Sequence, residues 1–252
     1  MLEVKDLVAG YGTHTVLQGV STAFSRGELT SVIGKNGCGK STLLKAMLGF
    51  LPHAHGEILL DGAKLSSRQR KEIARRIAYL AQGRDTPDMT VERMVLHGRF
   101  PHIGYPRSYG ERDRLIARAA MERMGILSLA DSPLDTLSGG MRQRAALIRT
   151  LAVNPDVLLL DEPFSALDYQ TRLSVCDDVY KIIRNERKTA LLITHDISEA
   201  ISVADKAIVL SKRPATVVAT HDVAFPESEP LKRRENKQFS QWFELLWKEL
   251  NV

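Results

Sequence analysis

The pattern of apolar and polar positions divides the chain into alternating strands and helices. Segments whose apolar residues alternate or cluster between turn residues are predicted to be strands. These segments are residues 2–11, 15–24, 27–34, 56–65, 77–82, 156–163, 189–196, 206–212 and 216–223. Segments with helical spacing are residues 40–50, 66–76, 171–187, 197–205 and 239–250. Within residues 56–65, Asp61-Gly62 predicts a turn between two strands, and serines at the start of residues 66–76 predict a helix cap.

The middle of the chain has a different character. Residues 90–100, 111–126 and 140–153 have helical patterns with no convincing strand between them. The flanking alternation of strand and helix predicts an α/β fold with a mainly parallel sheet. We therefore expect a core made of residues 1–84 and 158–225. An inserted helical subdomain would span residues 85–157, and a tail with a helix would span residues 226–252.

Composition narrows the classes of function that are possible but does not identify one. The chain has 252 residues, 44% hydrophobic and 26% charged, with a net charge of +5. Acidic residues are interspersed with the basic ones, which favours a solvated surface over a nucleic-acid or membrane-binding patch. The two cysteines, Cys38 and Cys176, predict neither a disulfide framework nor a zinc site. Neither a signal peptide nor an apolar run of about 18–20 residues is present, so we expect a soluble intracellular chain.

Residues 34–41 fit the pattern G-x-x-x-x-G-K-[ST] between a predicted strand and a predicted helix. Glycines let backbone N–H groups approach phosphate oxygens, and the helix N-terminus adds partial positive charge. Lys40 is expected to reach the β- and γ-phosphates of a nucleotide, and Ser41 to bind Mg²⁺. The nucleotide-binding residues expected here are Gly34, Asn36, Gly37, Cys38, Gly39, Lys40, Ser41 and Thr42.

An acidic pair follows a buried strand further along the chain. Residues 157–160 are all apolar and end in Asp161 and Glu162. Successive side chains at a strand end point to opposite sides. Asp161 is therefore expected to face Mg²⁺, while Glu162 is placed to activate an attacking water.

A second glycine-rich turn precedes a helix at residues 137–143, LSGGMRQ. Together with the motifs above, in this order, it resembles the nucleotide-binding subunit of ATP-binding cassette (ABC) transporters over essentially residues 1–225. The resemblance implies a P-loop NTPase (RecA-like) core with an N-terminal antiparallel β part and an inserted α-helical subdomain. It also implies a head-to-tail dimer with ATP between the subunits. Ser138, Gly139 and Gly140 of one subunit would then cap the γ-phosphate held by the other subunit's P-loop.

Further site residues follow from the same resemblance. Tyr11 would stack on adenine, and Gln82 would touch Mg²⁺ and the attacking water and link the site to the helical insertion. Residues 165–168 would cross the dimer interface through Asp168, and His195 would bond the γ-phosphate near Glu162. The expected catalytic residues are Glu162, His195, Gln82 and Lys40, the metal ligands are Ser41, Gln82 and Asp161, and Gln143 completes the second glycine motif.

The partners are implied by the resemblance as well. The helical insertion would dock onto an integral membrane permease, which places the chain peripherally at the cytoplasmic face of the membrane. We expect the membrane part to be a separate chain, which favours an importer served indirectly by a solute-binding protein. A separate exporter ATPase and a soluble ABC ATPase acting on DNA or ribosomes are the alternatives. The latter usually carries paired cassettes or coiled coils, so we expect no nucleic-acid partner.

The cargo remains open between two groups. Residues 137–168 and 209–218 resemble the nitrate, sulfonate and taurine importers, whereas residues 90–104 resemble the iron-siderophore and cobalamin importers. The first resemblance covers more residues and is slightly favoured. The second lies in the segment expected to contact the permease, and it therefore bears more directly on the choice of partner.

Three smaller expectations concern single features. Phe239, Leu246 and Leu250 lie on one face of the terminal helix, which favours packing against its own domain or a partner subunit over a membrane surface. The basic residues 231–237 predict a solvated helix start. Cys38 lies near a helix N-terminus and Lys40, an arrangement that predicts a lowered thiol pKa, so alkylation should inhibit ATP hydrolysis and bound nucleotide should protect.

Overall fold

The computed structural model describes residues 2–51, 55–65, 70–83, 87–165, 167–226 and 229–251. Within these residues, ten strands form two sheets with the orders β2-β1-β4-β5 and β10-β9-β3-β8-β7-β6. The strands are β1 (Leu2–Tyr11), β2 (His14–Phe24), β3 (Leu29–Ile33), β4 (His55–Leu60), β5 (Ala63–Lys64), β6 (Ile77–Leu80), β7 (Val157–Asp161), β8 (Thr189–Thr194), β9 (Lys206–Leu210) and β10 (Val217–Asp222). The predicted serine cap at residues 66–69 lies outside the described residues.

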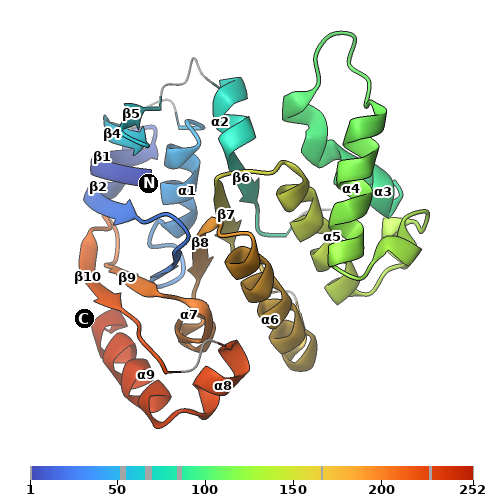
Figure 1. The fold of residues 1–252 in the computed structure, drawn as a ribbon. Helices are drawn as coiled ribbons and strands as arrows, with labels where there is room; N and C mark the ends of the chain where they lie inside the picture. Colours follow the sequence, from blue (N-terminus) through green and yellow to red (C-terminus); the bar gives the residue numbers. More distant parts are fainter. Residues whose placement is uncertain are drawn as a thin grey trace.

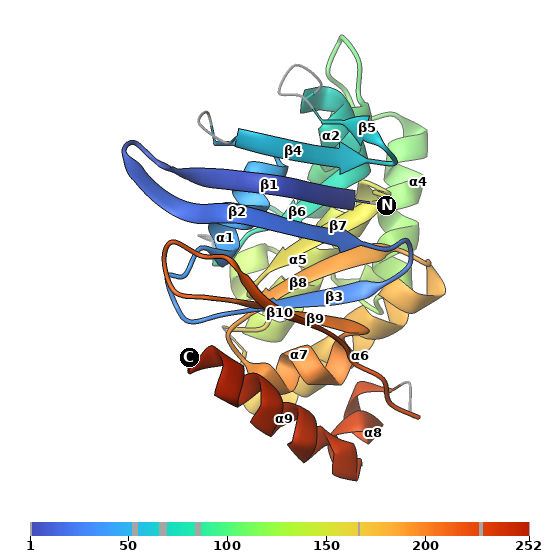
Figure 2. The same ribbon diagram turned by 90° about the vertical axis from the view of Figure 1, so that its left-hand side faces the viewer.

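The first sheet is antiparallel, as predicted for the N-terminal part. β1 pairs with β2 on one side and with β4 on the other, and β4 turns into β5 at Asp61-Gly62. Both turn residues have positive φ, 53° and 78°, the conformation that a tight two-residue hairpin requires. Figure 2 shows this sheet lying across the second one, with α1 (Lys40–Met47) near both. A large apolar cluster shared by both sheets holds them together.

The second sheet is parallel except at one edge. β9, β3, β8, β7 and β6 pair in parallel, and β10 pairs antiparallel to β9. Every residue of β3, β7 and β8 is buried, because helices and the first sheet cover both faces. The prediction of a mainly parallel α/β sheet is confirmed. Its consequence is that the loops after five strands meet at one edge.

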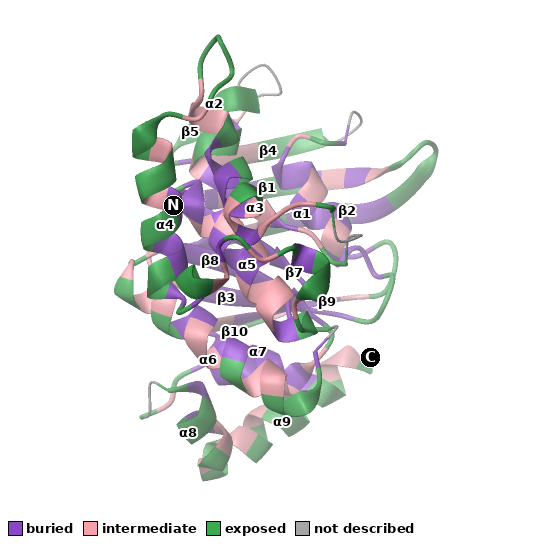
Figure 3. Cartoon of the chain, turned by 90° about the vertical axis from the view of Figure 1, so that its right-hand side faces the viewer, coloured by how far each residue is buried: buried purple, intermediate pink, exposed green. Residues whose placement is uncertain are grey.

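The remaining helices cover the sheet or extend beyond it. α2 spans Arg70–Arg76, α3 Val91–Leu96, α4 Glu111–Arg123, α5 Gly139–Ala152, α6 Tyr169–Asn185 and α7 Ile197–Val203. α3, α4 and α5 bury their own apolar cluster, centred on Val95, Met121 and Ile148, and lie to one side of the sheets (Figure 1). The outer face of α4 is exposed (Figure 3). None of the helices in the described ranges has the length and apolar character to cross a bilayer.

The helix predicted over residues 90–100 is shorter than expected. α3 ends at Leu96 and continues as a 3₁₀ turn, His97–His102, which contains Pro101. Gly98 lies so close to α5 that a Cβ would come within 2.1 Å of the Arg149 carbonyl oxygen. Arg99 is buried, donates to the Ala152 carbonyl at 2.8 Å and pairs with Asp113 at 3.0 Å. These contacts fasten the turn to α5 and α4 in place of another helical turn.

The C-terminal segment packs against its own domain. α8 (Pro230–Glu235) and α9 (Lys237–Leu250) follow β10, and Leu246 is fully buried in a cluster that includes Ile201 and Val209. The prediction of intramolecular packing is confirmed. The prediction of a solvated basic segment is wrong for Arg233, which is 4% exposed and donates to the Ala204 carbonyl at 2.8 Å.

The burial of Arg233 has a physical reason. Its guanidinium lies 5.7 Å from the centroid of the Tyr180 ring and 5.4 Å from that of Phe225. Contacts of a planar cation with aromatic faces offset part of the cost of removing it from water. The sequence pattern showed the charge of Arg233 but not its contacts with the rings of Tyr180 and Phe225.

Candidate nucleotide-binding site

An open cavity of about 330 Å³ lies at the edge where the parallel strands end. Its lining comes from the loops after β3, β6, β7, β8 and β9, so each of the five parallel strands contributes. The lining residues are Asn36, Gly37, Gly39, Lys40, Ser41, Thr42, Gln82, Glu162, His195 and Arg213. All but Arg213 are residues that the sequence predicted for the site. In open α/β sheets this edge is where ligands bind.

The loop between β3 and α1 has the backbone that its glycines allow. Gly37 and Gly39 have φ of 78° and 128°, and a Cβ on Gly39 would come within 2.9 Å of the side chains of Val16 and Leu17. Lys40 Nζ donates to the carbonyl oxygens of Gly34 at 2.7 Å and Lys35 at 3.3 Å. The ammonium therefore lies over the loop, at the N-terminus of α1, where an anion is favoured.

Ser41 and Asp161 meet across the sheet edge. The Ser41 hydroxyl donates to Asp161 Oδ1 at 3.0 Å, and the Tyr79 hydroxyl donates to Asp161 Oδ2 at 3.0 Å. A hydroxyl and a carboxylate oxygen are ligands suited to Mg²⁺, which binds through one or two protein groups and the substrate phosphates. The donor set fits that ion.

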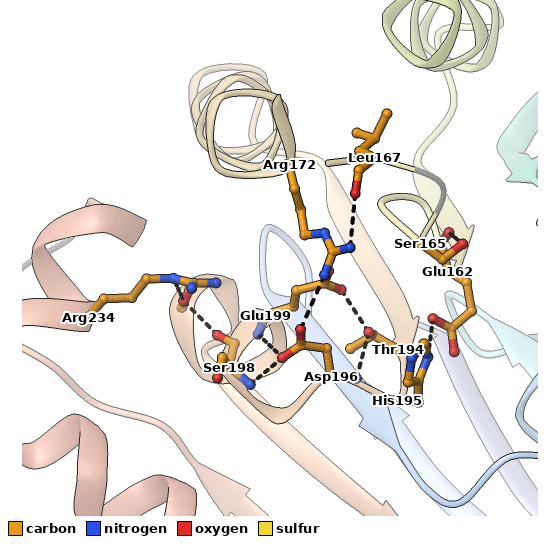
Figure 4. Close-up of polar contacts among 11 residues, drawn as sticks. Glu162, Ser165, Leu167, Arg172, Thr194, His195, Asp196, Ser198, Glu199 and Arg234 are labelled. Carbon is orange, nitrogen blue, oxygen red and sulfur yellow. Dashed lines mark hydrogen bonds and ion pairs between the residues drawn. The ribbon is translucent and has the colours of Figure 1, made fainter. Parts of the chain in front are cut away.

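Glu162 contacts a different partner from those of Asp161. Its backbone has φ of 49°, and its N–H donates to the Ile193 carbonyl at 2.9 Å. Its Oε2 lies 2.8 Å from His195 Nδ1 (Figure 4). Glu162 is 8% exposed, whereas half of the His195 side chain is accessible. A buried carboxylate thus contacts an exposed imidazole at the cavity wall.

A network of charged side chains lies next to the Glu162–His195 pair. Figure 4 shows Arg172 reaching the Leu167 carbonyl, at 3.0 Å, and approaching Asp196 and Glu199, at 3.5 and 3.6 Å. The Thr194 hydroxyl donates to Glu199 at 2.7 Å. Burial raises the pKa of the Glu199 carboxyl, and the Thr194 hydrogen bond and the Arg172 charge oppose that rise. The network joins the segment before α6 to the segment that carries His195.

The second glycine motif lies outside the cavity lining. Ser138 caps α5 and accepts from the Met141 N–H at 3.3 Å. A Cβ on Gly140 would come within 2.3 Å of Thr171 Cγ2, whereas one on Gly139 would meet only Leu167 Cδ2, at 4.0 Å. The start of α5 is therefore packed on one side and open at Gly139.

Two further predicted residues make contacts within their own subunit. Gln143 donates its side-chain N–H to the Pro163 carbonyl, which ties α5 to the loop after β7. Asp168 caps α6 by accepting from the Thr171 N–H at 3.0 Å, and the hydrogen bonds from Thr171 lower the pKa of Asp168. Ala166, in the predicted interface loop 165–168, lies outside the described residues.

The ABC transporter family matches residues 17–165 of the chain, which include the P-loop, the second glycine motif and the acidic pair. The chain belongs to this family. The ferric enterobactin transport ATP-binding protein FepC of Escherichia coli is 38% identical over 86% of the chain and 80% of its own length. The bicarbonate transport ATP-binding protein CmpD of Synechococcus elongatus is 34% identical over 93% and 82%. A dimeric post-hydrolysis structure of the ATP-binding cassette MJ0796 with ADP and Pi, 26% identical, covers 89% of this chain and 100% of its own, with a TM-score of 0.75.

This ABC protein is an ATPase, and its site includes residues that the sequence reading missed. Tyr79 holds Asp161 from the neighbouring strand β6, and Arg213 reaches the cavity from the loop after β9. The only sequence signal for Arg213 was its place shortly after a predicted parallel strand. Tyr11 is 46% exposed and lies outside the cavity lining, with Lys45 Nζ 5.9 Å from its ring centroid. An accessible ring remains compatible with the predicted adenine contact.

The expectation that Cys38 has a lowered pKa is wrong. The thiol is 3% exposed, and its burial raises the pKa of Cys38 despite the opposing charge of Lys40. A Cβ on Gly34 would come within 2.6 Å of the sulfur, so the side chain points inward under the P-loop. Proximity to positive charge was visible in the sequence, but the direction of the side chain was not.

Alkylation kinetics check this correction. Because a raised pKa lowers the thiolate fraction at any given pH, Cys38 in a Cys176→Ala background should react with iodoacetamide at pH 8 at least about tenfold more slowly when folded than in denaturant. The rate should rise as pH increases. Mass spectrometry of timed samples measures it. A folded protein that reacts faster than the denatured chain would restore the original expectation.

Proposed function

We propose that this chain is the ATP-hydrolysing subunit of a membrane importer of the bacterial type. The observation that carries the proposal is the cavity lined by the P-loop, by Ser41, whose hydroxyl donates to the buried Asp161, and by the Glu162–His195 pair. These are the groups that phosphoryl transfer to water needs: a phosphate cradle, a metal position and a base.

Each residue receives a role from its position. Backbone N–H groups of the P-loop and Lys40 would hold the β- and γ-phosphates of ATP, while Ser41 and Asp161 would hold Mg²⁺, with Gln82 nearby. When bound, that ion would neutralise charge on the phosphate oxygens. Glu162 accepts a proton from the attacking water, and His195 orients Glu162 through the 2.8 Å contact and faces the γ-phosphate.

The second glycine motif supports a dimer. Ser138 and Gly139 begin a helix that is open to solvent at Gly139 and does not line its own subunit's cavity. A helix N-terminus with small residues suits close contact with an anion. We infer that it covers the γ-phosphate held by a second copy, packed head to tail, so that each subunit supplies half of two sites.

A second groove suits the permease. It has a volume of about 600 Å³ and lies between α2, β6, the 3₁₀ turn and α5. Phe50 and Phe100, 62% and 51% exposed, lie at its walls with Arg70 and His97. Exposed aromatic rings in a concave surface are typical anchors for a partner. We assign this groove to a cytoplasmic helix of the permease, because it joins the helical segment to Tyr79, which contacts Asp161 of the ATP site.

The cargo is proposed from the docking segment. Residues 90–104 resemble the iron-siderophore and cobalamin importers, they include Phe100 of the groove, and FepC is a ferric enterobactin transport protein. We therefore favour a metal chelate. Residues 209–218 and the relative CmpD, a bicarbonate transport protein, support a small anion as the alternative. Mass-spectrometric identification of the permease that copurifies from solubilised membranes distinguishes the two.

The assignment of Glu162 as the base is tested by Glu162→Gln. Loss of a general base lowers turnover by about 10²–10⁴-fold, while the amide keeps the shape needed to bind ATP. Phosphate release measures turnover, and fluorescent-nucleotide titration measures affinity. Glu57→Gln, a change of the same kind on exposed β4, should leave both unaltered. Normal turnover in Glu162→Gln would show that another group activates the water.

The docking groove is tested by Phe100→Asp. Placing a charge at a buried interface should reduce recovery of the permease at least about tenfold. Leu115→Asp, on the exposed face of α4 and outside the groove, is the control and should retain recovery. Both variants should bind ATP like the parent, which checks their folding. Equal recovery with the two variants would place the permease elsewhere.

A further inference from the structure

Arg213 is the one residue lining this cavity that the sequence did not predict for the site. It lies in the loop between β9 and β10, together with Lys212, and is exposed. Neither an ion pair nor a hydrogen bond engages its guanidinium within the described part of the chain. An arginine held at a cavity wall without a carboxylate partner keeps all five donors for a ligand.

The loop that carries Arg213 is fixed at both ends. The Ser211 N–H donates to the Thr216 carbonyl at 3.0 Å, and the Thr216 N–H donates to the Ser211 hydroxyl at 2.9 Å. Ala215 is fully buried, donates to the Val16 carbonyl at 2.8 Å and accepts from the Gln18 N–H at 2.9 Å. These bonds close the loop and attach it to β2, so Arg213 stands on a supported turn.

The same strand, β2, supports the P-loop. Val16 and Leu17 pack where a Cβ of Gly39 would be, and Leu210 lies beside Gly34 in the same way, at 3.4 Å. The P-loop and the Arg213 loop are therefore positioned by shared contacts. The charge of Arg213 also acts on the Cys38 thiol, where it opposes the rise in pKa caused by burial. The guanidinium is thus close enough to influence groups inside the P-loop.

We propose that Arg213 is a nucleotide-binding residue whose guanidinium donates to phosphate oxygens of ATP held by the P-loop. The five parallel strands then each supply a ligand-facing loop, with Arg213 on the side of β3 opposite to His195, Glu162 and Gln82. A planar guanidinium matches two phosphate oxygens at once, which a lysine ammonium does not. This inference rests on the proposed function in so far as ATP binds at the P-loop.

The test compares nucleotide affinity in three variants of the full chain. Arg213→Gln should raise the Kd for ATP about tenfold, the effect of losing a charge-assisted hydrogen bond. Lys212→Gln removes the same unit charge one residue away, outside the cavity lining, and should leave the Kd within about twofold. Lys40→Ala reports whether ATP binds at the P-loop at all. Isothermal titration calorimetry measures each Kd, and melting without nucleotide should be the same for Arg213→Gln and the parent.

The outcomes separate the two proposals. A loss in Lys40→Ala and Arg213→Gln, but not in Lys212→Gln, supports the inference. Full affinity in Arg213→Gln alongside a loss in Lys40→Ala overturns it and leaves the proposed function intact. Equal losses in Arg213→Gln and Lys212→Gln also overturn it, because they reflect general surface charge. Unchanged affinity in Lys40→Ala would instead contradict ATP binding at the P-loop.

Discussion

The hydrogen bond between Ser41 and Asp161 holds together parts of the chain that are 120 residues apart. Ser41 lies in the first turn of α1, and Asp161 ends the fully buried strand β7. Because β7 is parallel to β8 and β6, its end lies level with theirs, and Glu162, His195 and Gln82 follow at the same edge. A change in the register of one strand would move its loop by a full residue and separate the phosphate cradle from the base.

The apolar interior fixes the positions of the loops that carry the polar groups of the site. β3, β7 and β8 have no exposed residue, so the loops at their ends start from fixed points. The glycines then allow backbone to pass where side chains would clash, as at Gly39 against Val16 and Leu17. Beside this buried interior, the His195 side chain and Gly139 are exposed. The polar groups of the site thus stand at the end of a buried sheet.

Much of this arrangement follows from the sequence because its causes are local. Three patterns each predict a backbone geometry within a few residues. They are the P-loop spacing, the apolar run before Asp161 and the helix start at Ser138. Contacts between distant segments were not accessible in the same way. The inward direction of Cys38 depends on Gly34, the burial of Arg233 depends on Tyr180 and Phe225, and the place of Arg213 depends on pairing with β2. Residue type showed the chemical group in each case, and packing decided its environment.

Sedimentation of Glu162→Gln with and without ATP and Mg²⁺ tests most directly whether two chains complete each ATP site. The variant should be a monomer alone and a dimer with nucleotide. Gly139→Trp adds bulk at a position where a Cβ would have only Leu167 Cδ2 near it, at 4.0 Å. The double variant Glu162→Gln, Gly139→Trp should therefore bind ATP and stay monomeric. A Glu162→Gln chain that is saturated with ATP and still sediments as a monomer would contradict the shared site.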